Sequence, residues 1–479
     1  MSLKSQTVSG VKWLVGGSFL HKLISFTTTI IIARYLGPSV YGLVSFAMVI
    51  VASFELFKSL GVDSALLRRT DDFDRAANTA FLIIPSLGLF LFILLYISAP
   101  YIGKIMGNPD LIPVTRALGI IFVMTCFSKV SNIVLEREMQ FKTVAIIEMI
   151  GSIIFSVVAI IGTFLDYKVW SLVLAYIIKS IFHFICVWIK ANWRPAFQFD
   201  KKLAREMLSF GKFIFLGSVL VYFKSALDSL LVGKLLGITM LGFYAVAFNI
   251  SNFSYEYFGI KVYRVTYPVY AKLAGSLDNL RGAYLKVTKY LSLIAIPLGL
   301  GVFLMGEDFL RVAYGNKWIG AIGVLKVLAW AGIFNTLPAS ASGIFMACGK
   351  PKESMKTTAV QVILFFLLIT PFAKLYGLVG VGSVVVLASL LSCIYTFYLL
   401  NKILHISSIS LFNSIKPALI SSLLMTVVII MMQILLSSIL NLHIIYKFFI
   451  VLIIAGMTYT YSIYKLEKDI FKEIKEIVF

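Results

Sequence analysis

The chain alternates between long hydrophobic runs and short polar segments along all of its 479 residues. The runs are about 20 residues long, enough for a helix to cross a hydrocarbon layer of roughly 30 Å. The longest polar stretch runs from Lys190 to Lys212, which leaves no room for a folded domain outside the membrane. The pattern predicts an all-α integral membrane protein of about 14 spans: 9–33, 41–60, 79–102, 111–133, 143–165, 168–189, 213–235, 238–260, 284–305, 319–347, 354–373, 377–401, 412–440 and 443–464.

A weak repeat relates the start of the chain to a segment 200 residues later. Ten residues recur unchanged at this offset: Lys12, Gly17, Ser18, Leu20, Ser25, Leu36, Gly37, Gly42, Ala47 and Ile50 recur as Lys212, Gly217, Ser218, Leu220, Ser225, Leu236, Gly237, Gly242, Ala247 and Ile250. The first copy and the second are six spans apart, so both enter the membrane from the same side. The repeat predicts a V-shaped transporter with two parallel six-helix bundles, 1–200 and 201–404, and an extra helix pair with a cytoplasmic tail in 405–479.

Composition and charge agree with a membrane chain. The sequence is 60% hydrophobic and 14% charged, with a mean hydropathy of +0.95. With both termini in the cytoplasm, the inner loops hold 22 Lys and Arg residues against seven in the outer loops. This asymmetry predicts that orientation, in an inner membrane. Anionic membrane lipids account for the net charge of +21 without a nucleic-acid partner.

Motifs of common enzymes are missing. The sequence has neither a P-loop nor an HExxH motif, and its four cysteines are scattered without CxxC spacing. Asp72 and Asp74 could be compared with the metal-binding DxD motif of glycosyltransferases, but they lie in a short inner loop without a nucleotide-binding fold. His21 and Lys22 inside the first apolar run favour a retained helix over a signal peptide. We therefore expect neither an enzyme nor a metal or other cofactor.

Polar residues follow one face of the first span of each repeat. In 9–33 they are Ser18, Lys22, Ser25 and Thr29, and in 213–235 they are Ser218, Tyr222, Ser225 and Ser229. Lys224 and Asp228 flank the second set. Matching stripes on two repeat-related helices indicate a shared hydrophilic cavity, because charge within a bilayer normally faces water or a partner. The alternative is close helix packing through small residues.

Further ionisable residues lie within other spans. Lys179 and His183 lie one turn apart in 168–189, and Lys326 lies in 319–347. We expect Lys179 to line the cavity in the first half and Lys326 to do so in the second. Together with Lys22 and Lys224, these lysines would give the cavity a cationic character.

Four acids within the spans are candidates for coupling transport to H⁺ or Na⁺: Glu55, Glu148, Asp228 and Glu256. A desolvated carboxylate can carry a proton. The structural alternative is local ion pairing, of Asp228 with Lys224 and of Glu55 with Lys58. Glu148 has no partner nearby in the sequence.

Several segments resemble Wzx-type polysaccharide flippases, particularly the branch that includes the colanic acid flippase. The resemblance extends over the whole chain, in order, and its motifs are Ser2–Lys4, Thr7–Trp13, Ala33–Gly42, Asn108–Pro113, Arg264–Lys272 and Tyr314–Trp318. The last motif departs from the family pattern, because Asn316 stands where the family usually has Glu. This departure puts in doubt any role for an outer-loop acid there.

The resemblance implies a fourteen-helix exporter of the multidrug/oligosaccharidyl-lipid/polysaccharide (MOP) superfamily. Its expected activity is to move an undecaprenyl-pyrophosphate-linked oligosaccharide from the cytoplasmic to the outer leaflet by alternating access. The expected partners are this lipid-linked substrate, membrane lipids, and the polymerase and glycosyltransferases of the pathway, with a monomer as the transport unit. A cationic cavity with hydroxyl groups would suit the anionic, hydrophilic headgroup.

Three other functions compete with this one. A drug or cation antiporter of the same fold would favour acids in its cavity, whereas this chain has lysines there. A polysaccharide polymerase or ligase would need a large catalytic loop outside the membrane, and the outer loops are short. A membrane scaffold would not need polar stripes in both repeats.

Overall fold

The computed structural model describes residues 24–439 and 443–468. All regular structure in these two ranges is helical, and ten of the helices are long and apolar enough to cross a membrane. A hydrocarbon layer offers no hydrogen-bond partners to a backbone, and a helix satisfies its backbone groups internally. The predicted all-α membrane class is therefore confirmed, and the count of 14 spans stays a prediction.

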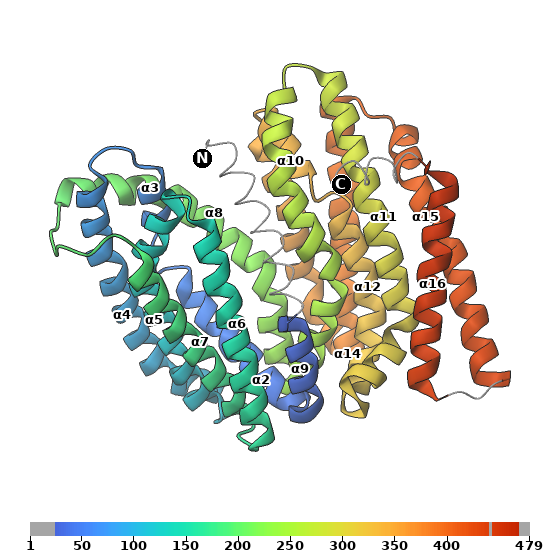
Figure 1. Cartoon of the computed structure of the whole chain (residues 1–479), viewed down its shortest axis with the longest axis horizontal. Helices are drawn as coiled ribbons and strands as arrows, with labels where there is room; N and C mark the ends of the chain where they lie inside the picture. The colour runs from blue at the N-terminus through green and yellow to red at the C-terminus, as the bar shows by residue number, and fades with distance from the viewer. Residues whose placement is uncertain (1–23, 440–442, 469–479) are drawn as a thin grey trace. The chain divides into compact units, whose positions relative to one another are not determined.

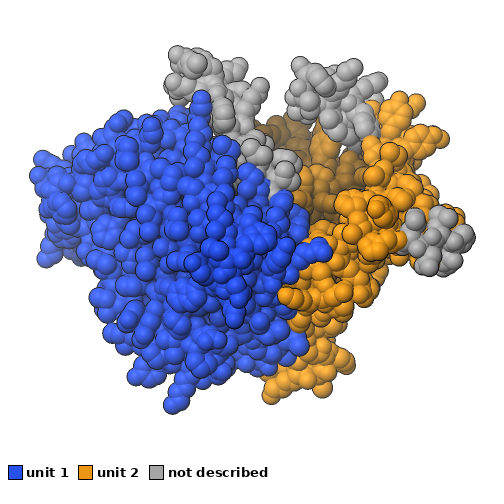
Figure 2. All heavy atoms as spheres, turned by 60° about the horizontal axis from the view of Figure 1, so that its bottom comes forward, with its two compact units in different colours: residues 1–242 blue, residues 243–479 orange. Residues whose placement is uncertain are grey.

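The chain forms two compact units, residues 1–242 and residues 243–479 (Figure 2). The predicted division at residue 200 follows the sequence repeat and stays a prediction. The first unit holds the helix Ile24–Leu36, α2 (Pro38–Glu55), α3 (Val62–Arg68), α4 (Phe73–Ile105), α5 (Leu111–Arg137), α6 (Phe141–Phe164), α7 (Val169–Lys190), α8 (Lys201–Leu236) and the start of α9 (Ile238–Ser251). Within it, α7 packs against both α5 and α6, and α8 packs on α2 and α3 (Figure 1).

The second unit begins within α9 and is centred on α11. Its elements are the π-helix η1 (Tyr255–Gly259), α10 (Ile260–Leu273), α11 (Leu277–Phe309), η2 (Leu310–Tyr314), η3 (Asn316–Ala321), α12 (Ile322–Thr336), α13 (Ala341–Ala347), α14 (Pro351–Leu404), α15 (Ser408–Ile434), η4 (Leu435–Ile439) and α16 (Ile444–Leu466). The long helix α11 packs against α12 and α15, and α15 packs against α16. The C-terminal helices thus join the unit through α11.

The element α14 is two helices joined at a break. Gly377 has φ 57° and ψ −137°, which is not a helical conformation. A residue with a β-carbon rarely adopts this φ, so glycine permits the break. The sequence predicted one span ending at residue 373 and the next starting at residue 377, which agrees with the position of this break.

The repeat is also visible in the backbone of the first unit. Gly37 (φ 80°, ψ 172°) and Gly237 (φ 92°, ψ 169°) make the same turn between two helices. One turn further on, a β-carbon on Gly42 would lie 2.0 Å from the carbonyl oxygen of Ile238, and one on Gly242 would lie 1.9 Å from that of Pro38. The start of α2 and the start of α9 therefore touch backbone to backbone, and only glycine permits this contact on both sides.

Candidate functional site

A charged cluster lies between α6 and α7 in the first unit. The Lys179 Nζ lies 3.7 Å from one carboxylate oxygen of Glu148, and the His183 Nε2 lies 3.4 Å from the other. The three side chains are partly accessible, with exposed fractions of 29% for Lys179, 45% for Glu148 and 20% for His183. One carboxylate is thus shared by two bases, and we call these three residues the Glu148 cluster.

The helices explain why these side chains meet. Lys179 and His183 are four residues apart, so they lie on one face of α7. Glu148 lies seven residues into α6, or about 10 Å along its axis, so the cluster lies well inside the apolar segment. The lysine stem packs against Gly151, whose β-carbon position is 3.5 Å from the Lys179 Cγ, an ordinary van der Waals distance. The cluster is therefore built by the packing of α6 on α7.

Hydroxyl groups continue the polar side of α6 away from the cluster. Ser152 donates to the carbonyl of Glu148 (2.9 Å), and Ser156 donates to the carbonyl of Ser152 (2.8 Å). Thr28 lies 2.7 Å from the Ser156 hydroxyl and 2.7 Å from the Ile24 carbonyl, linking the helix Ile24–Leu36 to α6. The buried end of this row, at Ser156 and Thr28, packs helices together, whereas the end at Glu148 is accessible.

The geometry of the Glu148 cluster leaves hydrogen-bonding capacity unused. Both contacts to the carboxylate are longer than the usual 2.7–3.2 Å of a nitrogen–oxygen hydrogen bond. An ammonium group has three donors, so Lys179 can bind a second anion while it remains near Glu148. The cluster can therefore accept an anionic group such as a phosphate.

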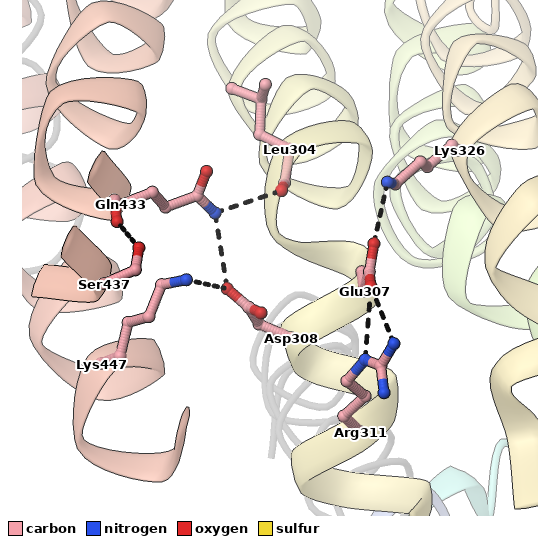
Figure 3. Close-up of polar contacts among 8 residues, drawn as sticks. All are labelled: Leu304, Glu307, Asp308, Arg311, Lys326, Gln433, Ser437 and Lys447. Atoms are coloured by element: carbon pink, nitrogen blue, oxygen red, sulfur yellow. Dashed lines mark hydrogen bonds and ion pairs between the residues drawn. The ribbon is translucent and has the colours of Figure 1, made fainter. Parts of the chain in front are cut away.

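A second cluster, the Glu307 cluster, lies in the second unit and contains the predicted residue Lys326. The Lys326 Nζ lies 3.1 Å from one oxygen of Glu307, and Arg311 donates to the other oxygen from Nη2 (3.0 Å) and Nε (3.3 Å) (Figure 3). These contacts join α11, η2 and α12. Both oxygens of this carboxylate therefore accept charge-assisted hydrogen bonds.

The neighbouring acid, Asp308, contacts the C-terminal helices. Its carboxylate accepts a hydrogen bond of 3.4 Å from the Gln433 amide and lies 3.9 Å from the Lys447 Nζ (Figure 3). Gln433 also donates to the Leu304 carbonyl (3.3 Å). These contacts fasten α15 and α16 to α11. The pattern of apolar runs did not single out Glu307 or Asp308, because both follow the end of the predicted span 284–305.

The other three predicted acids differ in their burial and in their hydrogen-bond partners. Glu55 pairs with Lys58 at 3.1 Å, as the spacing indicated, and it also accepts from Thr125 (3.1 Å). Asp228 is buried and accepts from the backbone N–H of Ser229 (2.6 Å). Glu256 is exposed in the π-helix η1.

The polar stripes of the two repeats are described only in part. Ser18 and Lys22 lie outside the described residues, as do the side chains of Lys224 and Ser225. Ser25 is half-buried, and Ser218 is exposed and donates to the Ile214 carbonyl (3.0 Å). The cationic cavity that these residues would line stays a prediction.

Tyr222 ties α8 to α2. Its hydroxyl donates to the Val49 carbonyl (2.7 Å) and lies 2.6 Å from the Ser53 hydroxyl. Both neighbours are on α2, so this part of the stripe on α8 faces a helix of the same unit.

In the described ranges, no group of three or more His, Cys, Asp or Glu side chains could hold a metal ion.

Known proteins resemble the chain over nearly its full length. A protein-family model described as "Polysaccharide biosynthesis protein" matches residues 31–323. The teichuronic acid biosynthesis protein TuaB of Bacillus subtilis is 24% identical over 424 residues, covering 88% of each chain. The lipopolysaccharide biosynthesis protein WzxC of Escherichia coli is 22% identical over 404 residues, covering 84% of this chain and 82% of WzxC.

Solved structures show the same fold. The lipid II flippase MurJ in an inward closed conformation superposes with a TM-score of 0.79 at 17% identity, covering 96% of this chain and 99% of MurJ. An inward-facing multidrug resistance MATE transporter of the MOP superfamily gives a TM-score of 0.63 at 16% identity, covering 80% and 94%. The fold is that of a MOP-type membrane transporter, and by the match over residues 31–323 the chain belongs to the polysaccharide biosynthesis protein family.

Proposed function

We propose that this protein flips an undecaprenyl-pyrophosphate-linked oligosaccharide from the cytoplasmic to the outer leaflet of the inner membrane. The family and the fold support a transporter of polysaccharide biosynthesis. Curated relatives include the succinoglycan biosynthesis transport protein ExoT of Rhizobium meliloti, 23% identical over 383 residues. The exported units would be polymerised outside the cell into a surface polysaccharide.

The observation that carries this proposal is the Glu148 cluster. Lys179 lies inside an apolar helix and is partly accessible. Its carboxylate neighbour Glu148 lies 3.7 Å away and also contacts His183. A pyrophosphate headgroup carries negative charge and several acceptor oxygens, which an ammonium group recognises. The lipid tail needs no polar site, because it can remain in the bilayer.

The other predicted residues would complete the binding region around Lys179. Lys22 and Lys224 would add cations to the same binding region, alongside Ser18, Ser25, Ser218, Tyr222 and Ser225. Lys326 is a weaker candidate, because it already binds Glu307 at 3.1 Å. Alternating access of the two halves would expose the headgroup first inside and then outside. The transport unit would be a monomer with both termini in the cytoplasm, working beside glycosyltransferases and a polymerase.

Transport would be driven by an H⁺ or Na⁺ gradient or by removal of the product outside. Glu55, Glu148, Asp228 and Glu256 are the acids available for coupling. Lys58 and Thr125 already contact one oxygen of Glu55, which makes a structural role for this acid a direct alternative.

Export of polysaccharide from living cells tests the proposal. We expect a strain lacking this gene to accumulate lipid-linked oligosaccharide inside, and the intact gene to restore export. Lys179→Ala should restore far less at equal protein level, whereas Lys104→Ala, an exposed lysine in the last turn of α4, should restore it fully. Normal export with Lys179→Ala would remove the residue from the mechanism. Drug resistance without any effect on polysaccharide would favour a MOP-type antiporter.

A further inference from the structure

The Glu148 cluster contains one imidazole, the side-chain type whose charge changes between pH 5 and 8 when its pKa is unperturbed. The cluster contains a carboxylate, an ammonium group and an imidazole. Of these three types, only the imidazole has an unperturbed pKa between 5 and 8. In this cluster that side chain is His183, whose Nε2 lies 3.4 Å from Glu148.

The charged groups that face His183 come from α6 and from its own helix, α7. Glu148 faces it from α6, and Lys179 and Tyr176 lie on its own helix. Tyr41 of α2 is the neighbour of Tyr176, and Lys129 of α5 instead pairs with Asp63 of α3 at 3.0 Å. The charge beside His183 is therefore set by one carboxylate and one ammonium group.

Protonation changes this balance in one direction. With a neutral imidazole, Glu148 and Lys179 cancel each other, and the cluster carries no net charge. With a protonated imidazole, the carboxylate has two cationic partners, and the cluster carries one positive charge. Because both contacts are long, a stronger bond to His183 can draw the carboxylate away from Lys179 without breaking a short hydrogen bond.

We infer that His183 is a proton-binding site that controls whether Lys179 is available to the anionic headgroup. The inference rests on the proposed function, since it assigns the pyrophosphate to Lys179. One hydronium proton from the solution adds to the ring nitrogen that carries none in the neutral imidazole, releasing water, and the Lys179 ammonium group then turns from Glu148 to the phosphate oxygens. By linkage the coupling is reciprocal, so a bound anion also favours the protonated imidazole.

The sign of this coupling has a consequence for the driving force. A proton that binds to the cluster together with the headgroup moves in the same direction as the headgroup. It therefore cannot be the proton that enters the cell in exchange for the exported headgroup. The Glu148 cluster therefore regulates loading of the substrate by pH, and an inward proton flow that drives export must use another acid.

Binding of farnesyl pyrophosphate, a short water-soluble prenyl pyrophosphate, tests the inference in lipid nanodiscs between pH 6 and pH 8. The phosphate itself titrates in this range, so the informative quantity is the difference between the intact protein and His183→Gln. We expect the affinity of the intact protein to rise on acidification by at least about fivefold more than that of the variant, the lower end of ordinary coupling between sites. His183→Asn serves as a second variant, and His405→Gln is the matched control outside α7.

The outcomes separate the two proposals. Equal pH dependence in the intact protein and both His183 variants would overturn the inference and leave the flippase proposal standing. Equal binding by the intact protein and Lys179→Ala would overturn the assignment of the headgroup to Lys179, and the inference with it. The His405→Gln control should match the intact protein at every pH.

Discussion

The Glu148 cluster and the Glu307 cluster each place one carboxylate between two basic side chains, one cluster in each unit. In the Glu307 cluster the contacts are 3.0 and 3.1 Å, and the partners are an arginine and a lysine. In the Glu148 cluster the contacts are 3.4 and 3.7 Å, and one partner is a histidine. In the first arrangement both carboxylate oxygens accept hydrogen bonds of ordinary length, whereas in the second both contacts are longer than an ordinary hydrogen bond.

The difference separates two roles that look the same in the sequence. Lys179 and Lys326 are both lysines within apolar helices, yet Lys326 is held in a short ion pair that joins α11 to α12. A fixed guanidinium fork makes the Glu307 cluster a structural tie. The lesson is that the contacts of a membrane lysine, more than its depth, decide whether it is available to a substrate.

Replacing the two lysines in turn should give the largest difference between the clusters. We expect Lys179→Ala to lower polysaccharide export at least about tenfold, the effect of losing one charge-assisted contact. Lys326→Ala should lower export less than about twofold at equal protein level, because this lysine contacts Glu307 and not the headgroup. Export measured from cells with matched expression decides the point. A loss of export with both variants would break the comparison and return Lys326 to the binding region.

For the stability of the fold we expect the larger effect in the Glu307 cluster, whereas for export we expect it in the Glu148 cluster. Glu307→Gln leaves Arg311 and Lys326 without an anionic partner, and we expect a loss of about 1–2 kcal/mol in the free energy of unfolding. Glu148→Gln should cost less than about 1 kcal/mol, because its contacts are longer and the carboxylate itself is partly exposed. Thermal unfolding in detergent micelles measures both. The two clusters would be structurally equivalent if both variants melted at the same lower temperature.

An arginine at His183 would make the Glu148 cluster chemically like the Glu307 cluster. Arginine remains charged at all working pH values, so His183→Arg should hold Glu148 permanently. We expect binding of farnesyl pyrophosphate to keep its acidic-pH affinity up to pH 8, apart from the titration of the phosphate. A fall in affinity at pH 8 equal to that of the intact protein would show that the imidazole charge is not the controlling group.

The Asp63–Lys129 pair provides a third carboxylate for comparison, on the short helix α3 outside the candidate spans. Burial alone would raise the pKa of Asp63, but Lys129 at 3.0 Å and hydrogen bonds from Ser59 and the Ser64 N–H lower it below its usual value. A lowered pKa stabilises the fold above the unfolded-state value near 4, and this stability is lost as the pH falls through the folded-state value.

Asp63→Asn should therefore reduce stability by about 1 kcal/mol at pH 7 and by less at pH 3. Thermal unfolding of the intact protein and the variant at the two pH values measures the difference. An equal difference at both values would mean that the carboxylate charge does not contribute.

The sequence located most helices because their apolar runs are long and end at polar residues. The spans predicted at 143–165 and 168–189 correspond to α6 (Phe141–Phe164) and α7 (Val169–Lys190). Helix packing was not accessible in the same way. Glu148 and Lys179 were singled out separately, since the pair is formed by two helices and the residues lie 31 positions apart.

The missing partner of Lys326 has a different cause. The predicted span 284–305 stopped before Glu307, because acidic residues lower the local hydropathy, whereas α11 continues to Phe309. The spacing of Glu307 and Arg311, four residues apart and followed by Lys326 in the next helix, was the signal that could have identified the cluster. Charged residues at a span end are as informative as those at its centre when they can pair across helices.

We propose that this protein moves a prenyl-pyrophosphate-linked oligosaccharide across a bilayer with the help of Lys179. The most direct measurement is the flipping of such a lipid, fluorescently labelled on its sugar, in vesicles containing the purified protein. We predict that the intact protein exposes the label to an external quencher much faster than empty vesicles do, and that Lys179→Ala is at least about tenfold slower. Equal rates for the intact protein and empty vesicles would contradict the proposed function, and equal rates for the intact protein and Lys179→Ala would contradict the proposed site.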